Sequence, residues 1–268
     1  MTLLVTMVSK YGIVHLSDSH TSNQDQVVVT DAKKIFRVPS ADTAVSVSGS
    51  YRVGSQAMDE WMPTFLQKQS DAGNITPAGI AHMLCQDLTS AWDKGTDAQI
   101  MSYGGILHIA GYVVESGINH PECWSVRNRE EQTAKSGSYV MVTTGEFVAI
   151  EHFWTQYQQD AALRESIQSG SHWQYINGSH LARRGLGIIL DYLHRALNEV
   201  WSTKSLEGID GSQSLFRSPR SIEEVRELGE FYLRGACLLY RLSDYKIAVI
   251  GGEIQSEMIP VPLSTSGL

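Results

Sequence analysis

Thr2 is the residue near the N-terminus whose type and position could do chemistry. Methionine aminopeptidases remove the initiator only before small residues, so loss of Met1 would leave Thr2 with a hydroxyl and a free α-amine on one residue. An α-amine has a reference pKa of about 7.7–8.0, so it is partly neutral near pH 7 and can accept the hydroxyl proton. The alternative is a threonine that merely begins a strand, with Met1 retained. Position alone favours that alternative.

The rest of the sequence lacks the usual signatures of other reaction classes. It has no HExxH, G-x-S-x-G, Walker loop or GxGxxG with an acidic ribose ligand. The stretch "TDAK" has the spacing of SxxK, but it lies at the entry to a strand. The three cysteines are widely separated and form no CxxC, which predicts free thiols without a disulfide framework or a zinc site. We expect neither a metal nor a cofactor.

Length and charge limit the class of protein. The 268 residues suffice for one large domain, and a hydrophobic content of 42% is that of a globular protein. A net charge of -8, with no run of Lys or Arg longer than two, argues against nucleic acid as a partner. No apolar run approaches the ~20 residues of a membrane span. The first residues lack the pattern of a signal peptide, so a cytoplasmic location is expected.

Hydrophobic periodicity predicts strands, two helices, strands, two helices and final strands. The first fifty residues read as a strand meander, and the charged "NREEQ" reads as a turn between later strands. A helix is expected after Thr76 and Pro77, and another after the capping pair Ser221 and Glu224. Two sheets face to face, with helix pairs outside, would bury every apolar face. The predicted class is therefore α/β (α+β), as a four-layer α/β/β/α sandwich in one domain, 1–268.

The opening run "TLLVTMVSKYGIVHLSDSHT", with "DAKKIF" and "VSVSGS" after it, resembles the β-type proteasome subunits and the bacterial proteasome-like (ClpQ-type) proteases. These are N-terminal nucleophile (Ntn) hydrolases. Asp18 lies 16 residues and Lys34 32 residues after Thr2, and both spacings match the family pattern. Later stretches, "ILHIAGY" and "SIEEVRELGEFYLRGA", are also similar. The segment of about 130–175 is longer than the family needs.

The resemblance implies roles for individual residues. Thr2 would be the nucleophile, Lys34 would lower the pKa of its hydroxyl, and Asp18 would hold the lysine ammonium in place. The backbone N–H of Gly49 would bind the oxyanion. Val47 would line an apolar pocket for the substrate side chain. Lys33, the neighbour of Lys34, is expected to point to the opposite face of the sheet.

Other implied positions leave alternatives open. Ser179 matches the family serine near the terminal amine, although it would also serve as a helix N-cap, and Ser136 is a second candidate. Ser243 and Asp244 occur in reversed order relative to the family pair. His20 stands where many relatives have arginine; it either bonds to the lysine–carboxylate pair or is a plain loop residue. His15 in mid-strand is expected to be packed.

Three functions fit these observations. The first is a threonine-type peptidase that cleaves peptide or protein substrates through an acyl-enzyme. The resemblance implies a homo-oligomeric ring and an ATPase unfoldase as a partner. The second is an Ntn amidase or transpeptidase, which the long 130–175 region favours because it could cap a pocket. The third is a non-catalytic proteasome-like subunit that keeps Met1.

Overall fold

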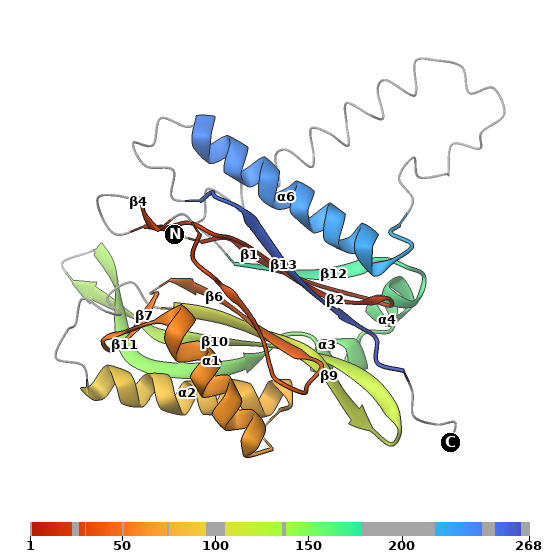
Figure 1. Ribbon diagram of the computed structural model, residues 1–268, viewed down its shortest axis with the longest axis horizontal. Helices are drawn as coiled ribbons and strands as arrows, with labels where there is room; N and C mark the ends of the chain where they lie inside the picture. The colour runs from red at the N-terminus through yellow and green to blue at the C-terminus, as the bar shows by residue number, and fades with distance from the viewer. Residues whose placement is uncertain are drawn as a thin grey trace.

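The computed structural model describes residues 2–22, 27–29, 31–49, 51–73, 75–94, 105–135, 138–177, 218–242 and 250–263. Within these ranges the protein has an α+β fold made of antiparallel sheets and helices (Figure 1). The coarse fold class expected from the sequence is therefore confirmed. The predicted helix that begins near Ser179 lies outside the described residues.

The first sheet has four strands in the order β12-β1-β2-β13, and every neighbouring pair is antiparallel. Its members are β1 (Leu4–Ser9), β2 (Gly12–Asp18), β12 (His172–Asn177) and β13 (Ile254–Pro260). Strands β1 and β2 form the hairpin predicted around Tyr11 and Gly12. Both strands are buried along their whole length, which means that each face of this sheet is covered.

The second sheet has five strands in the order β11-β10-β9-β6-β5, again all antiparallel. Its members are β5 (Ile35–Arg37), β6 (Thr43–Gly49), β9 (Gly105–Glu115), β10 (Ile118–Lys135) and β11 (Ser138–Glu151). Two small ribbons complete the described strands, namely β3 (Thr21–Ser22) with β4 (Val27–Val29) and β7 (Arg52–Val53) with β8 (Gln56–Ala57).

Five helices are described: α1 (Met58–Asp71), α2 (Pro77–Lys94), α3 (Trp154–Gln159), α4 (Ala161–Gln168) and α6 (Ile222–Leu242). The two predicted caps form. The Thr76 hydroxyl accepts from the N–H of Gly79 at 3.1 Å, and the Ser221 hydroxyl accepts from the N–H of Glu224 at 3.3 Å. The Glu224 carboxylate in turn accepts from the N–H of Arg220 at 2.9 Å. These bonds satisfy N–H groups that a helix start leaves free.

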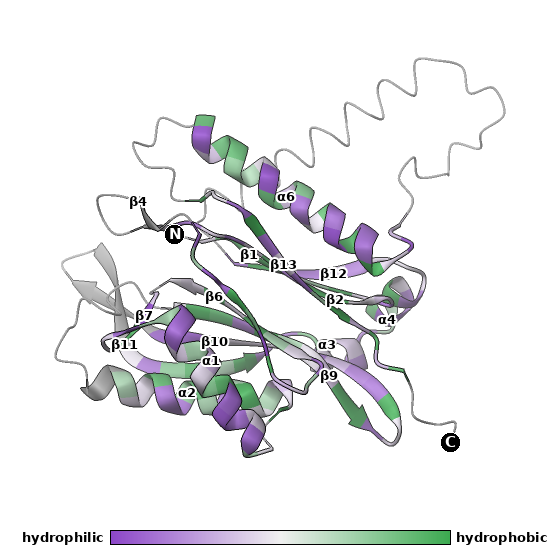
Figure 2. Cartoon of the chain, in the orientation of Figure 1, coloured by the Kyte–Doolittle hydropathy of each residue, from purple (hydrophilic) through white to green (hydrophobic). Residues whose placement is uncertain are grey.

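Apolar side chains gather in three clusters that set the order of the elements. One lies between α6 and the four-stranded sheet, and a second lies between the five-stranded sheet and helices α1 and α2. The third, which includes Val8, Ile13, Ala44 and Ala110, joins strands of both sheets. Green and purple bands alternate along α6, as expected of a helix with one buried face (Figure 2).

Helix α6 lies very close to the hairpin β1–β2. A Cβ added at Gly229 would lie 2.5 Å from the Leu16 Cδ1 and 2.9 Å from the Met7 Sδ. Such distances are far below van der Waals contact, so glycine is what permits this approach. The hairpin is consequently held between α6 on one side and the second sheet on the other.

Three local predictions are wrong. The first fifty residues do not form a meander, because the hairpin β1–β2 belongs to one sheet and β5–β6 to the other. The "NREEQ" stretch is not a turn, because β10 continues through it with a register shift between Asn128 and Glu130. Pro63 does not break its helix, because α1 runs unbroken from Met58 to Asp71. A β-bulge absorbs one extra residue without ending the strand pair.

The long 130–175 region is mostly regular structure. It contains the end of β10, strand β11, the short helices α3 and α4, and most of β12. Strand β12 pairs with β1 from Leu4 opposite Asn177 to Ser9 opposite His172. This region therefore completes both sheets, and its last strand lies beside the strand that follows Thr2.

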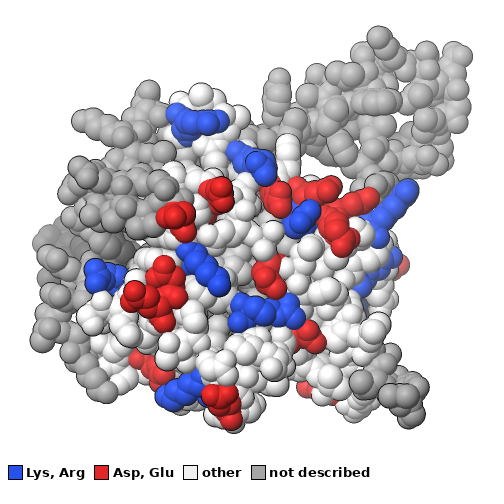
Figure 3. All heavy atoms as spheres, in the orientation of Figure 1, with Lys and Arg blue, Asp and Glu red and all other residues white. Residues whose placement is uncertain are grey.

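The surface carries charges of both signs. On the face drawn in Figure 3, acidic and basic side chains are intermixed, and no continuous basic stripe crosses the described part of that face. Among the described residues, no helix combines the length and hydrophobicity that crossing a bilayer requires.

Candidate active site

Thr2 and Asp18 are brought together by the first hairpin. The β1–β2 register places Leu4 opposite Ser17, so the residue before β1 lies beside the end of β2. The N–H of Leu3 donates to the Asp18 Oδ1 at 2.9 Å, which closes this end of the hairpin. Thr2 is 5% exposed and Asp18 is fully buried. Two residues far apart in the sequence thus share one buried corner of the four-stranded sheet.

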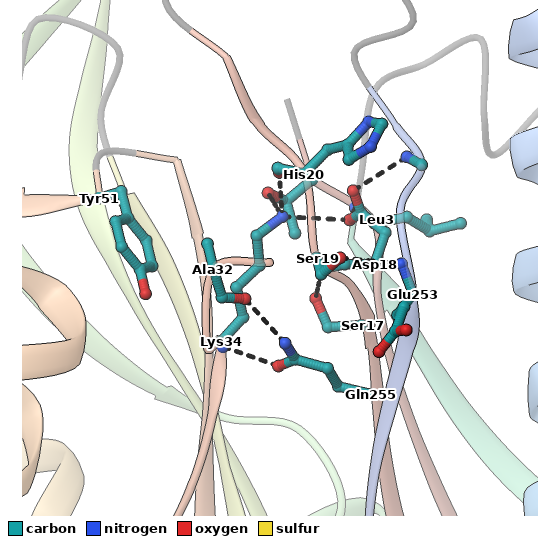
Figure 4. Close-up of polar contacts among 12 residues, drawn as sticks. Leu3, Ser17, Asp18, Ser19, His20, Ala32, Lys34, Tyr51, Glu253 and Gln255 are labelled. Atoms are coloured by element: carbon teal, nitrogen blue, oxygen red, sulfur yellow. Dashed lines mark hydrogen bonds and ion pairs between the residues drawn. The ribbon is translucent and has the colours of Figure 1, made fainter. Parts of the chain in front are cut away.

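Lys34 reaches this corner from the other sheet, just before β5. Its Nζ donates to the Thr2 Oγ1 at 2.8 Å and lies 3.4 Å from the Asp18 Oδ1. It also donates to the backbone carbonyl of His20. Figure 4 shows the Lys34 side chain extending toward Asp18 and His20. Three contacts match the three protons of an ammonium, so this buried cation has a full set of partners.

Burial dominates the electrostatics of this ion pair. It lowers the pKa of Lys34 below its ordinary value, and the Asp18 carboxylate opposes that change. It raises the pKa of Asp18, while Lys34 and the N–H groups of Leu3 and Gly251 oppose that rise. Both shifts follow from removing charge from water, so each group depends on the other for its ionised form.

Gly251 anchors the carboxylate from a distant part of the chain. Its N–H donates to the Asp18 Oδ2 at 3.2 Å, and its carbonyl accepts from the N–H groups of Ser19 and His20. A Cβ at this position would lie 2.8 Å from two atoms of the His20 ring, so the ring rests directly on the glycine. The His20 Nδ1 is buried without a hydrogen-bond partner. His20 therefore contacts Lys34 through its backbone, which neither sequence alternative anticipated.

Gln255 on β13 is the second residue that the sequence analysis missed. Its Oε1 accepts from the N–H of Lys34 at 2.8 Å, and its Nε2 donates to the carbonyl of Ala32 at 2.7 Å (Figure 4). No sequence signal marks it, because a glutamine in a strand is ordinary. Gly251 had a weak signal in the glycine pair of "IGGE", which could have indicated a close backbone approach.

Gly49 and Val47 lie on β6, which pairs with β5 after Lys34. Gly49 is exposed and has a φ of +95°, a conformation that suits glycine. The N–H of Val47 donates to the carbonyl of Lys34 at 2.9 Å, which holds this strand beside the lysine. The Val47 side chain is 2% exposed and packs in the cluster under α1 and α2. The structure therefore places it in the core, and its role in a substrate pocket stays a prediction.

The neighbouring candidates divide clearly. Lys33 is exposed and lies over the Phe36 ring, 5.4 Å from its centroid, so the predicted contrast with buried Lys34 is confirmed. His15 is fully buried, in agreement with a packing role. Four other candidates lie outside the described residues: Ser136, Ser179, Ser243 and Asp244.

The arrangement suits activation of the Thr2 hydroxyl. An ammonium that donates to the hydroxyl oxygen stabilises the alkoxide, and it therefore favours loss of the hydroxyl proton. The carboxylate behind the ammonium keeps it charged and in place. Among the described residues, no group of three His, Cys, Asp or Glu side chains is arranged to hold a metal ion.

Comparisons with known proteins add no identity. No protein-family model matches the chain, and no curated protein is significantly similar to it.

Proposed function

We propose that this chain is a threonine-type peptidase of the proteasome β-subunit kind. The observation that carries the proposal is the 2.8 Å hydrogen bond from the Lys34 Nζ to the Thr2 Oγ1, with Asp18 3.4 Å behind the ammonium. The three residues come from two sheets and are buried together. A buried lysine needs strong compensation, so its placement on a threonine hydroxyl is more informative than a surface contact would be.

The fold is consistent with the proposed class. We propose that the two sheets and their helices form the four-layer α/β/β/α sandwich of Ntn hydrolases, as a single domain. In support, α6 contacts β1, β2 and β13, α2 contacts β9, β10 and β11, and strands of the two sheets contact one another. The nucleophile of such an enzyme begins the first strand, which is where Thr2 lies.

The reaction would begin once Met1 is removed, since only then does Thr2 have a free amine. That amine takes the hydroxyl proton, directly or through a water, as the oxygen attacks the substrate carbonyl. The N–H of Gly49 would bind the resulting oxyanion, and Lys34 would stabilise the developing charge on the Thr2 oxygen. Collapse of the intermediate transfers the proton to the leaving amine and leaves an ester on Thr2. Water then attacks that ester and restores the free hydroxyl.

Assembly and partners belong to the same proposal. A peptidase of this kind would work as a homo-oligomeric ring in the cytoplasm, with peptide or protein substrates delivered by an ATPase unfoldase. The amidase or transpeptidase alternative relied on the 130–175 region as a cap over a pocket. Because β12 pairs with β1 and completes a sheet, that strand is not free to act as a cap.

The test is an intact mass measurement on protein produced without an N-terminal tag. The expected result is loss of one methionine and, after treatment with a peptide epoxyketone, addition of one inhibitor molecule. Thr2→Ala is the matched control, because alanine also permits removal of Met1 and keeps the amine while removing the hydroxyl. Retained Met1 with no adduct would contradict the proposal and favour a non-catalytic subunit. Adduct formation without peptide hydrolysis, in a protein that is not a ring, would favour the amidase.

A further inference from the structure

We propose that Gln255 is a positioning residue that sets where the Lys34 ammonium lies relative to the Thr2 hydroxyl. Its side-chain amide makes two hydrogen bonds to one short stretch of backbone, accepting from the Lys34 N–H at 2.8 Å and donating to the Ala32 carbonyl at 2.7 Å. Donor and acceptor of one planar amide thereby pair with an acceptor and a donor two residues apart. This is the pattern that a neighbouring strand would provide.

The amide lies where the site needs a connection between the two sheets. Thr2 and Asp18 belong to the four-stranded sheet, whereas Lys34 leads into β5 of the five-stranded sheet. Strand β13 pairs with β2, with Ile254 opposite Asp18 and Gln255 opposite Ser17. Gln255 is thus fixed to the strand that carries the carboxylate, and it holds the backbone that carries the cation.

The other contacts of this backbone leave the role to Gln255. The Ala32 N–H donates to the Ser19 carbonyl at 3.1 Å, and the Lys34 carbonyl accepts from Val47 at 2.9 Å. The Ala32 carbonyl and the Lys34 N–H face the Gln255 amide. Without the amide, a buried N–H would lose its partner and the segment before β5 could shift. Because the Lys34 Nζ must lie within hydrogen-bond distance of Thr2, a small shift of its backbone changes reactivity.

The kinetic part of this inference rests on the proposed function, and a second measurement does not. The variant is Gln255→Met, which keeps the length of the side chain and removes both hydrogen bonds. The matched control is Glu257→Gln on the same face of β13, which removes the ion pair with Arg37 and leaves the amide of Gln255 in place. The first readout is the rate of epoxyketone addition to Thr2 as a function of inhibitor concentration and pH. The second is the pH titration of the Lys34 amine by NMR of lysine-labelled protein, and thermal unfolding checks that each variant folds.

We expect Gln255→Met to lower the maximal addition rate roughly 10- to 100-fold, with little change in the inhibitor concentration for half-maximal rate and a displaced pH profile. Glu257→Gln should leave all three near the wild-type values. A folded Gln255→Met protein that reacts at the wild-type rate, with an unchanged Lys34 titration, would overturn the positioning role. If the wild-type protein does not react, the proposed function fails and the NMR titration alone decides. A displaced Lys34 signal then supports the positioning role, and an unchanged one overturns it. If Gln255→Met does not fold, Gln255→Glu is measured instead, since it keeps the acceptor for Lys34 and loses the donor to Ala32.

Discussion

We expect acid to destabilise this fold through His15, which lies in the middle of β2 with no exposed surface. Its Nδ1 is 3.3 Å from the Ser46 Oγ and its Nε2 is 3.4 Å from the Ala110 carbonyl, so neutral imidazole can satisfy both contacts. Burial lowers the pKa of His15 to about 4; the Ala110 carbonyl opposes this change, and nearby Arg37 adds to it. Protonation in the folded state would place a cation between two sheets with no carboxylate in hydrogen-bond contact with its described ring atoms.

The size of the effect follows from the two pKa values. The folded pKa lies below that of an unfolded histidine, about 6.5, so the unfolded state binds the proton more readily. The contribution of His15 to stability is therefore complete above pH 6.5 and is lost as pH falls toward 4. For these values the loss is about 2 kcal/mol at pH 5 and about 3 kcal/mol when complete. The buried His108, whose pKa is also lowered by burial, adds to the loss in the same direction.

The assay is urea unfolding of the wild-type chain and of His15→Gln at a series of pH values from about 7.5 to 4.5. Glutamine keeps hydrogen-bonding capacity and does not titrate, so the variant should lose less stability on acidification than the wild type, by about 2 kcal/mol at pH 5. Comparing the two chains at each pH cancels the titration of Asp18 and of the surface carboxylates. Equal losses in both chains would refute the reasoning and place the acid sensitivity elsewhere.

Two further substitutions test the site. Lys34→Met removes one partner of a buried ion pair and should cost about 3–5 kcal/mol near pH 7 in chemical unfolding, less in acid where Asp18 is protonated, and it should abolish epoxyketone addition. An unchanged unfolding free energy would show that the pair is not ionised. Gly251→Ala inserts a Cβ 2.8 Å from the His20 ring and should lower stability by about 1–3 kcal/mol in thermal unfolding. Gly105→Ala, where the nearest atoms are 3.7 Å away, is its control and should show little change.

Local signals in the sequence were enough to predict several elements. Turn residues predicted the hairpin β1–β2, and the helix caps at Thr76 and Ser221 are where the sequence placed them. These succeed because a cap or a two-residue turn depends on atoms only a few residues apart. The spacing of Asp18 and Lys34 from Thr2 predicted a cluster that the structure does bring together.

The failures are all cases where distant contacts decide. The first strands were expected to alternate, with one solvent face, but β1 and β2 are buried on both faces because α6 covers one and the second sheet the other. Pairing of β12 with β1 spans more than 160 residues of sequence and has no local signal. Gln255 and Gly251 contact the site from the end of the chain, where nothing in the residue types indicates their partners.

The distribution of the site over the two sheets has a physical consequence. Thr2 and Asp18 are fixed to each other by the hairpin, so their separation changes little as long as β1 and β2 stay paired. Lys34 has no such link within its own sheet, and its distance from Thr2 depends on how the two sheets face one another. Contacts that cross between the sheets near this corner, from Gln255 to the Lys34 backbone and from Lys34 to the carbonyl of His20, therefore control reactivity more directly than the packing of either sheet alone. Substitutions that loosen the sheet-to-sheet contact should reduce the reactivity of Thr2 before they reduce the stability of the fold.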